Sequence, residues 1–169
     1  MALTRDLIRE IVAADTYRVA ATPMLLFAEL TDALALCVHD EARGVGGLLH
    51  LRSPGSSGRP SDATDIELNS VLVFLDRFKG EVLGSTAPSD SVQARIVAHA
   101  SPTAVIDDAS ASMVDLLKAD LDDSKIICGT QTLRRPDPVY VCFQPCEGRM
   151  RICAPNEIPG YAQRRRTGD

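Results

Sequence analysis

The residue best placed to do chemistry in this chain is His50, which follows the pair Gly46 and Gly47 in an apolar segment. Glycine has no side chain, so such a pair lets the backbone come close to a bound molecule. An imidazole beside it can act as a general base near neutral pH. The sequence therefore predicts that a substrate or partner approaches the chain at His50.

A β-hairpin must position this histidine. Residues 33–38 form an apolar run, and residues 40–44 supply a polar turn that ends in Gly44. A second apolar strand then leads to His50. Two apolar strands joined by a short polar turn are typical of a hairpin. We therefore expect His50 on the second strand of the pair.

Over residues 24–56 the sequence resembles the CheD family, the chemoreceptor glutamine deamidases of bacterial chemotaxis. In that family an apolar strand ends in Leu-Gly-Ser-Cys, a second strand ends in Asp, and a polar turn leads to Gly-Gly-x-x-His. The resemblance implies a cytoplasmic amidohydrolase with a cysteine-hydrolase-like fold, whose thiolate and imidazole release ammonia from a carboxamide. The positions that match without a gap are Leu30, Asp40, Gly44, Gly46, Gly47, His50, Pro54, Gly55 and Ser56.

The family's nucleophile is missing in this ungapped register. Its cysteine falls on Ala33, and its active-site threonine, six residues earlier, falls on Phe27. Alanine cannot be a nucleophile. Two later family motifs, Phe-Gly-Gly-Ala and Asp-x-Gly-Gly, are also replaced, by residues 97–100 and 129–132. The register thus predicts a CheD-like fold without CheD chemistry.

A second register keeps an enzyme possible. Thr31 lies six residues before Cys37, so Thr31, Cys37 and His50 would reproduce the family's Thr, Cys and His. Cys37 precedes His50 by only thirteen positions, whereas the family has seventeen, so this register deletes four residues of a strand. An even deletion keeps each side chain on its face of the sheet.

Three functions follow from these alternatives. The first is a degenerate deamidase that binds its partner, and the second is an active protein-glutamine deamidase using Cys37 and His50. The third is a hydrolase without cysteine, in which Asp32 works with His50. The resemblance implies chemoreceptor cytoplasmic helices or a CheC-type phosphatase as partner. The candidate binding residues are Phe27, Asp32, Ala33, Gly46, Gly47, Leu49, Leu51 and the loop 53–60.

Composition sets broad limits. The chain has 169 residues, is 45% hydrophobic and carries a net charge of −5, with its one dense basic cluster at residues 164–166. This predicts one α+β domain over residues 1–160 and a disordered basic tail over 161–169. The negative net charge of the chain argues against nucleic-acid binding. The apolar runs are too short to cross a membrane, and the charged N-terminus does not resemble a signal peptide, so a cytoplasmic location is expected.

The cysteines give no cofactor site. Five are present, at positions 37, 128, 142, 146 and 153, and none forms a Cys-x-x-Cys pair. An odd number of cysteines in a chain expected to be cytoplasmic favours reduced thiols. No cofactor is expected. A metal site remains an alternative only at Cys142 and Cys146, which are four residues apart.

Periodicity predicts mixed β-structure flanked by two helices. The first helix begins at a Thr64-x-x-Glu67 capping box and ends near Gly80 or Gly84, and the second covers residues 110–121. Shorter strands are expected at residues 8–14, 17–19, 94–98 and 125–128, the last as a short buried strand followed by a terminal hairpin over 139–152. His99 is expected in the core or at its rim.

Overall fold

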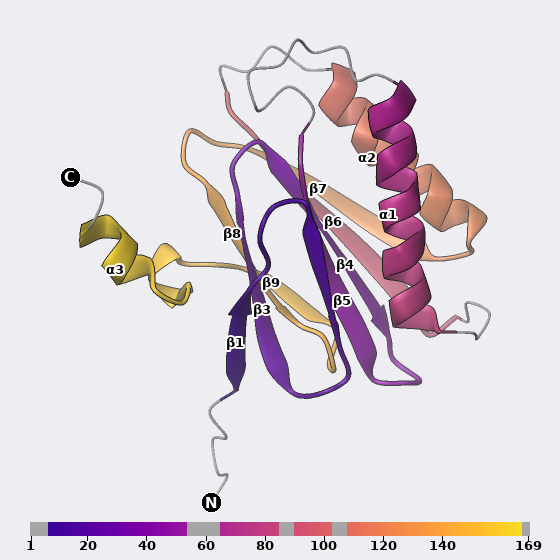
Figure 1. Cartoon of the computed structure of the whole chain (residues 1–169), viewed down its shortest axis with the longest axis horizontal. Coiled ribbons are helices and arrows are strands. Elements are labelled where there is room, and N and C mark those ends of the chain that lie inside the picture. Colours follow the sequence, from indigo (N-terminus) through magenta and orange to yellow (C-terminus); the bar gives the residue numbers. More distant parts are fainter. Residues whose placement is uncertain (1–6, 54–64, 85–89, 103–107, 167–169) are drawn as a thin grey trace, which may run out of the picture.

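The structure is a computed structural model of the chain, and it describes residues 7–53, 65–84, 90–102 and 108–166. It is a two-layer β-sandwich with two helices on one outer face, so the predicted α+β class is confirmed (Figure 1). The smaller sheet has the order β1-β3-β8-β9, and the larger has the order β2-β5-β4-β6-β7. The elements are β1 (Ile8–Ile11), β2 (Thr16–Ala20), β3 (Met24–Leu30), β4 (Ala33–Asp40), β5 (Val45–Arg52), α1 (Asp65–Leu83), β6 (Val92–Ala100), α2 (Asp108–Asp123), β7 (Ile127–Arg134), β8 (Val139–Gln144), β9 (Arg149–Cys153), a 3-10 turn (Pro155–Glu157) and α3 (Tyr161–Arg166).

The predicted hairpin is the centre of the larger sheet. β4 and β5 pair antiparallel without interruption from Ala33 opposite Arg52 to Asp40 opposite Val45. β4 also pairs along its full length with β6, and β5 pairs with β2. Apolar side chains fill both faces of β4, because one face meets the smaller sheet and the other meets the helices.

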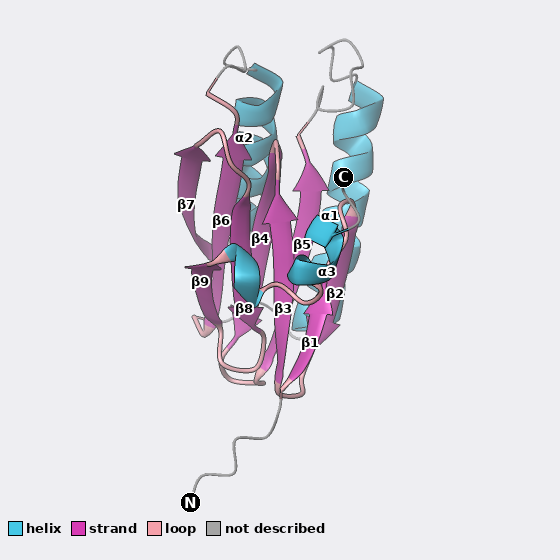
Figure 2. Cartoon of the chain, turned by 90° about the vertical axis from the view of Figure 1, so that its left-hand side faces the viewer, coloured by secondary structure: helices cyan, strands magenta, loops and turns pink. Residues whose placement is uncertain are grey.

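Three apolar clusters hold the layers together. Between the larger sheet and the helices lie side chains such as Leu36, Phe78 and Met113. Between the two sheets lie Leu30, Cys37, Leu48 and others. The third cluster covers the outer face of the smaller sheet and packs beneath the C-terminal segment; it contains Phe27, Tyr140, Cys142, Cys153 and Ile158. Figure 2 shows the sheets and the helices in a view turned by 90°.

The first helix ends as its glycine predicts. α1 stops at Leu83, and Gly84 has a positive φ of 62° and donates its N–H to the carbonyl of Gly80. The predicted capping residue Thr64 lies outside the described residues. The second predicted helix is confirmed as α2, and the terminal hairpin as β8 and β9.

Several predicted boundaries differ from the structure; the first strand, expected over 8–14, ends at Ile11. The strand expected at 125–128 is β7, which begins at Ile127, is twice as long as expected and is mostly exposed, because it forms the edge of its sheet. Residues 161–166, at the start of the predicted tail, form α3 (Tyr161–Arg166). The ring of Tyr161 packs edge-on against Tyr140, with 6.2 Å between centroids, and this contact orders the segment.

Candidate functional site

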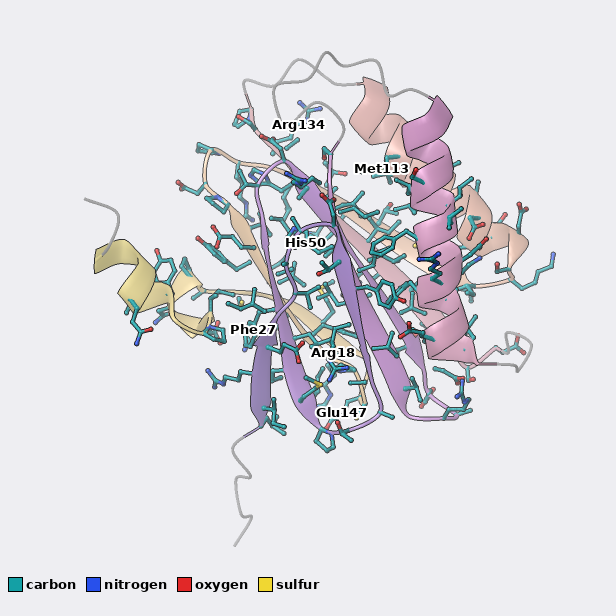
Figure 3. All side chains as sticks on the ribbon, in the orientation of Figure 1. Arg18, Phe27, His50, Met113, Arg134 and Glu147 are labelled. Atoms are coloured by element: carbon teal, nitrogen blue, oxygen red, sulfur yellow. The ribbon has the colours of Figure 1, made fainter. Side chains whose placement is uncertain are left out.

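His50 lies on β5 and faces the space between the two sheets. It is directly opposite Ala35 of β4 and Thr16 of β2, and its side chain is 5% exposed. Its Nδ1 donates a hydrogen bond of 2.9 Å to the carbonyl oxygen of Val12. Since a carbonyl only accepts, this bond places the proton of the neutral ring on Nδ1 and leaves a lone pair on Nε2. Figure 3 shows His50 among the strands of the sandwich.

The electrostatic environment keeps this imidazole neutral. Burial is the main effect and lowers the pKa of His50 below its usual value of 6.5. The hydrogen bond to Val12 and the carboxylates of Asp15 and Glu29 act in the opposite direction and are weaker. A neutral imidazole with a free lone pair can accept a hydrogen bond or a proton.

A turn between β1 and β2 supports His50 from one side. Asp15 has a positive φ of 59° and donates its backbone N–H to the carbonyl oxygen of His50, at 2.8 Å. Its carboxylate accepts hydrogen bonds from the backbone N–H of Arg52, at 3.1 Å, and from Nε of the same residue, at 2.7 Å. The turn therefore fixes the backbone from His50 to Arg52. Asp15, Val12 and Arg52 are not among the residues predicted from the sequence, because nothing local in a sequence indicates contacts between residues 37 or 38 positions apart.

Ala33 lies two residues before Ala35, so its side chain shares the face of His50. It begins β4, between Arg52 of β5 and His99 of β6. Diagonal neighbours of this kind are about 7–8 Å apart in an antiparallel sheet. A thiol at this position would be a cross-strand neighbour of the imidazole, whereas the methyl group of alanine offers no nucleophile.

Asp32 does not form an acid–base pair with His50. It occupies the turn between β3 and β4 with a positive φ of 45°, and its carboxylate accepts a hydrogen bond of 2.9 Å from the backbone N–H of Ser101. Its own backbone N–H donates to Nδ1 of His99, and Nε2 of His99 donates to the carbonyl of Arg135. The carboxylate and the backbone N–H of Asp32 therefore both form hydrogen bonds that hold the end of the sheet together. None of the hydrogen bonds among the described residues joins Asp32 to His50, so the structure lends no support to a hydrolase based on this pair. His99 is a core histidine within β6, as expected.

Cys37 lies on the same face as His50, two residues beyond Ala35 in the other direction. Its side chain is 4% exposed and belongs to the apolar cluster between the sheets. Burial strongly raises the pKa of its thiol, and the nearby Arg95 only partly opposes this effect. A thiol in such surroundings stays protonated and is a poor nucleophile.

Thr31 is not brought together with Cys37. It is exposed in the turn before β4, whereas Cys37 lies in the middle of that strand. Six residues of extended chain span about 20 Å. The structure therefore does not assemble Thr31, Cys37 and His50 into one site.

Three predicted binding residues are core residues. Phe27 is 1% exposed and lies in the cluster on the outer face of the smaller sheet. Leu49 and Leu51 are 0% and 4% exposed and face the helices. Their side chains pack in apolar clusters beneath the helices or the C-terminal segment, so they do not form an exposed docking surface. The loop predicted to bind with them lies outside the described residues from position 54 onward.

The glycine pair serves packing and not substrate approach. A Cβ on Gly46 would collide with the backbone of Pro145 in the turn between β8 and β9. A Cβ on Gly47 would lie 2.6 Å from the ring of Phe78 on α1. Each glycine therefore allows one layer to contact β5 closely, and the prediction that the pair faces a ligand is corrected.

Neither a metal-binding cluster nor a membrane-spanning helix occurs in the described residues. No group of three or more His, Cys, Asp or Glu side chains there could hold a metal ion. None of the helices in these ranges combines the length and the hydropathy that a membrane crossing requires.

Comparison with known proteins gives one informative relative. The chain is 23% identical over 159 residues to a probable chemoreceptor glutamine deamidase CheD of Thiobacillus denitrificans. The alignment covers 90% of this chain and 77% of that protein. No family model matches the chain. Along nearly its whole length, the chain is therefore similar to a CheD protein.

Proposed function

We propose that this protein is a CheD-like component of chemotaxis that binds its partner without deamidating it. The proposal rests on the lack of an activated nucleophile on β4 beside His50. On the face of β4 that His50 shares, Ala35 is directly opposite the imidazole, and Ala33 and Cys37 are its two diagonal neighbours. The alanines carry no nucleophile, and burial raises the pKa of the Cys37 thiol, so it stays protonated. The similarity to a CheD protein over 90% of the chain supports the chemotaxis assignment.

The state of His50 suits binding of an amide. Its Nδ1 is fixed by Val12, and no hydrogen bond joins its Nε2 to any described residue. The lone pair on Nε2 can accept a hydrogen bond from the carboxamide N–H of a glutamine. Without a thiolate the carboxamide carbon is not attacked, so the amide is held and not hydrolysed.

The surface around this end of the sandwich is polar. Thr31, Arg52 and Arg135 are exposed there, around the turns that the Asp32 and Asp15 hydrogen bonds hold together. We propose this rim as the docking surface, in place of the buried Phe27, Leu49 and Leu51. The proposed partner is the glutamine-bearing cytoplasmic helical bundle of a chemoreceptor, and a CheC-type phosphatase is the second candidate.

The direct test combines binding with mass spectrometry. A chemoreceptor cytoplasmic fragment is titrated with the protein by calorimetry, and the fragment is then analysed for conversion of glutamine to glutamate. We expect binding without conversion. A Thr31→Arg variant should weaken binding, whereas Val73→Arg, on the exposed surface of α1, should not. Conversion that disappears in Cys37→Ala would instead establish the active deamidase, and a CheC-type phosphatase that binds where the receptor fragment does not would select the second partner.

A second test asks which position lies beside the histidine. Iodoacetamide labelling is followed across pH 5 to 9 in the wild type and in Ala33→Cys, with Ala35→Cys as a buried control on the same strand. We expect the thiol at position 33 to label about tenfold faster or more than Cys37, and to slow when His50 is changed to Ala. Fast labelling of native Cys37 that depends on His50 would refute the proposal.

A further inference from the structure

Residues 154–163 lie over an apolar face of the smaller sheet. The outer face of antiparallel strands in a sandwich is commonly solvated and polar. Here it carries Phe27, Tyr140 and Cys142, whose side chains are buried in the cluster beneath the C-terminal segment. We call residues 154–163 the strap, and Figure 2 shows the 3-10 turn and α3 in front of this sheet. The smaller sheet therefore has an apolar surface whose cover follows the last strand.

Three side chains of the strap seat it on the sheet. Ile158 is 4% exposed and packs in the apolar cluster. The ring of Tyr161 packs edge-on against Tyr140. The carboxylate of Glu157 accepts hydrogen bonds from both terminal nitrogens of the Arg151 guanidinium. The sheet is thus recognised by a carboxylate, an aliphatic side chain beside it and an aromatic ring three residues further on.

Most of the remaining strap is exposed to solvent. Its turns are local, because the N–H of Glu157 donates to the carbonyl of Ala154 and the N–H of Tyr161 donates to that of Ile158. The ion pair of Glu157 with Arg151 is itself exposed, and exposed pairs contribute little stability. The strap is therefore held by few buried side chains, and its turns do not depend on the sheet. Its exposed residues are Ala154, Pro155, Asn156, Gly160, Ala162 and Gln163.

The apolar face extends past the strap. Leu25 and Ile11 belong to the same cluster as Phe27, but their side chains are only partly buried. They lie on β3 and β1, on the side of the sheet away from β9, where the strap begins. A segment that also covered the exposed part of Leu25 would bury more apolar surface than the strap does.

The charges of this face favour a carboxylate. Glu147, in the adjacent turn, pairs with Arg149. Arg9 and Arg151 remain, and both lower the pKa of Glu157. An acidic residue of a bound segment would meet the same two cations. Glu29 lies at the opposite end of β3 from Leu25. Alternation along the strands places these charged side chains of the sheet on the face: Arg9, Glu29, Arg149 and Arg151.

We propose that the outer face of the smaller sheet binds a peptide segment of a partner protein, and that the strap masks this site in cis. The segment carries the side-chain types that the strap carries at Glu157, Ile158 and Tyr161. A tethered strap acts at a high effective concentration, so its few contacts keep the face covered until a partner competes. A segment that also covers Leu25 gains the contacts to displace it. The site lies on the other sheet from His50, and the proposal does not depend on the proposed function.

The test uses the strap sequence itself as the ligand. A fluorescent peptide of residues 154–163 is titrated with the full chain, and its anisotropy is followed. Glu157→Arg repels Arg151 and leaves the core untouched, and Ile158→Asp places a charge where an aliphatic side chain is buried. Both variants should bind the peptide about tenfold or more tighter than the wild type. Ala162→Asp, at an exposed position of the strap, should bind it as the wild type does, and a scrambled peptide should bind to none of them.

Alkylation of Cys153 reports whether the face is open. Its thiol is buried in the cluster beneath the strap. With iodoacetamide it should react about tenfold faster in both strap variants than in the wild type, and saturating peptide should slow the reaction again. Arg151→Glu, added to Ile158→Asp, should weaken peptide binding by about tenfold or more. Arg149→Glu in the same background, two residues earlier on the strand, makes the same change of charge and should not.

Four results would overturn the proposal. Variants that expose Cys153 but do not bind the peptide would show that the face has no affinity for such a segment. Equal binding by the variants and the wild type would place the peptide on another surface. Unchanged alkylation of Cys153 in both strap variants would make the strap a permanent part of the fold. Dimers that exchange their straps, detected by sedimentation of the wild type, would assign the face to a second copy of the chain.

Discussion

His50 and Val12 form a hydrogen bond that links the two sheets of the sandwich. The imidazole of His50 belongs to the larger sheet and donates to the carbonyl of Val12 at 2.9 Å. The N–H of Val12 donates in turn to the carbonyl of Phe27 in the smaller sheet. The histidine that resembles a catalytic base is therefore also part of the framework. Its two roles can be separated experimentally.

Replacing His50 by Asn should remove a pH dependence of stability. The amide of Asn can still donate to Val12 but does not titrate. Because burial lowers the pKa of His50, the unfolded chain binds more protons than the folded protein below about pH 6.5. The wild type should therefore lose stability, relative to His50→Asn, as the pH falls below that value. Urea unfolding of both proteins at about pH 7.5 and about pH 5 measures the difference. An equal response of the two proteins would contradict the assigned pKa direction.

Replacing Gly46 by Ala should destabilise the fold. The new Cβ would meet the backbone of Pro145, which cannot move aside as a side chain would, so we expect a loss of about 1–3 kcal/mol in the free energy of unfolding. Gly80→Ala is the matched control, because it lies in α1 with open space around it, and it should gain about 0.5–1 kcal/mol. Denaturant unfolding tests both variants. If Gly46→Ala is as stable as the wild type, the glycine is not needed for packing.

Replacing Cys37 should affect stability and not binding. Cys37→Ala leaves a small cavity between the sheets, at a cost of about 1 kcal/mol. Cys37→Ser should cost more, by about 1–3 kcal/mol, because it buries a hydroxyl in an apolar cluster. Thermal unfolding gives the order, and calorimetry with the receptor fragment should give an unchanged affinity. A variant that folds normally but no longer binds would place Cys37 in the binding site.

Replacing Glu157 by Gln should loosen the C-terminal segment. Glu157 accepts hydrogen bonds from Arg151, at 2.7 and 3.1 Å, and from the backbone N–H of Ala154, and these bonds lower its pKa from 4.5 to about 2. Its contribution is therefore complete above about pH 4.5 and is lost as the pH falls towards 2. In Glu157→Gln at neutral pH, we expect faster amide exchange at Ala154 and faster alkylation of Cys153, whose pKa burial raises to about 11.

Glu147→Gln is the control for this variant. Glu147 pairs with Arg149 in the turn between β8 and β9, away from the C-terminal segment. It should leave the alkylation of Cys153 unchanged. Equal alkylation of Cys153 in Glu157→Gln and the wild type would show that the ion pair does not hold the segment in place.

The sequence by itself determined the local elements. The central hairpin, both main helices and the terminal hairpin follow from short-range periodicity, the polar turn and the glycine stop at Gly84. These patterns reflect contacts between residues close in the chain, so they can be recognised without the fold. The position of His50 on the second strand of the hairpin was predicted in the same way and is confirmed.

Only the tertiary structure decided what each face of these elements meets. The sequence predicted that a ligand approaches Gly46 and Gly47. In the structure, Pro145 and the ring of Phe78, which are distant in sequence, fill the space beside the two glycines. Phe27 and Leu49 were predicted to bind a partner. In the structure the C-terminal segment covers Phe27, and α1 covers Leu49. The contact of His50 with Val12 spans thirty-eight residues. Such contacts depend on how the layers stack, and the periodicity of a single strand is the same whether a partner, a helix or another sheet covers it.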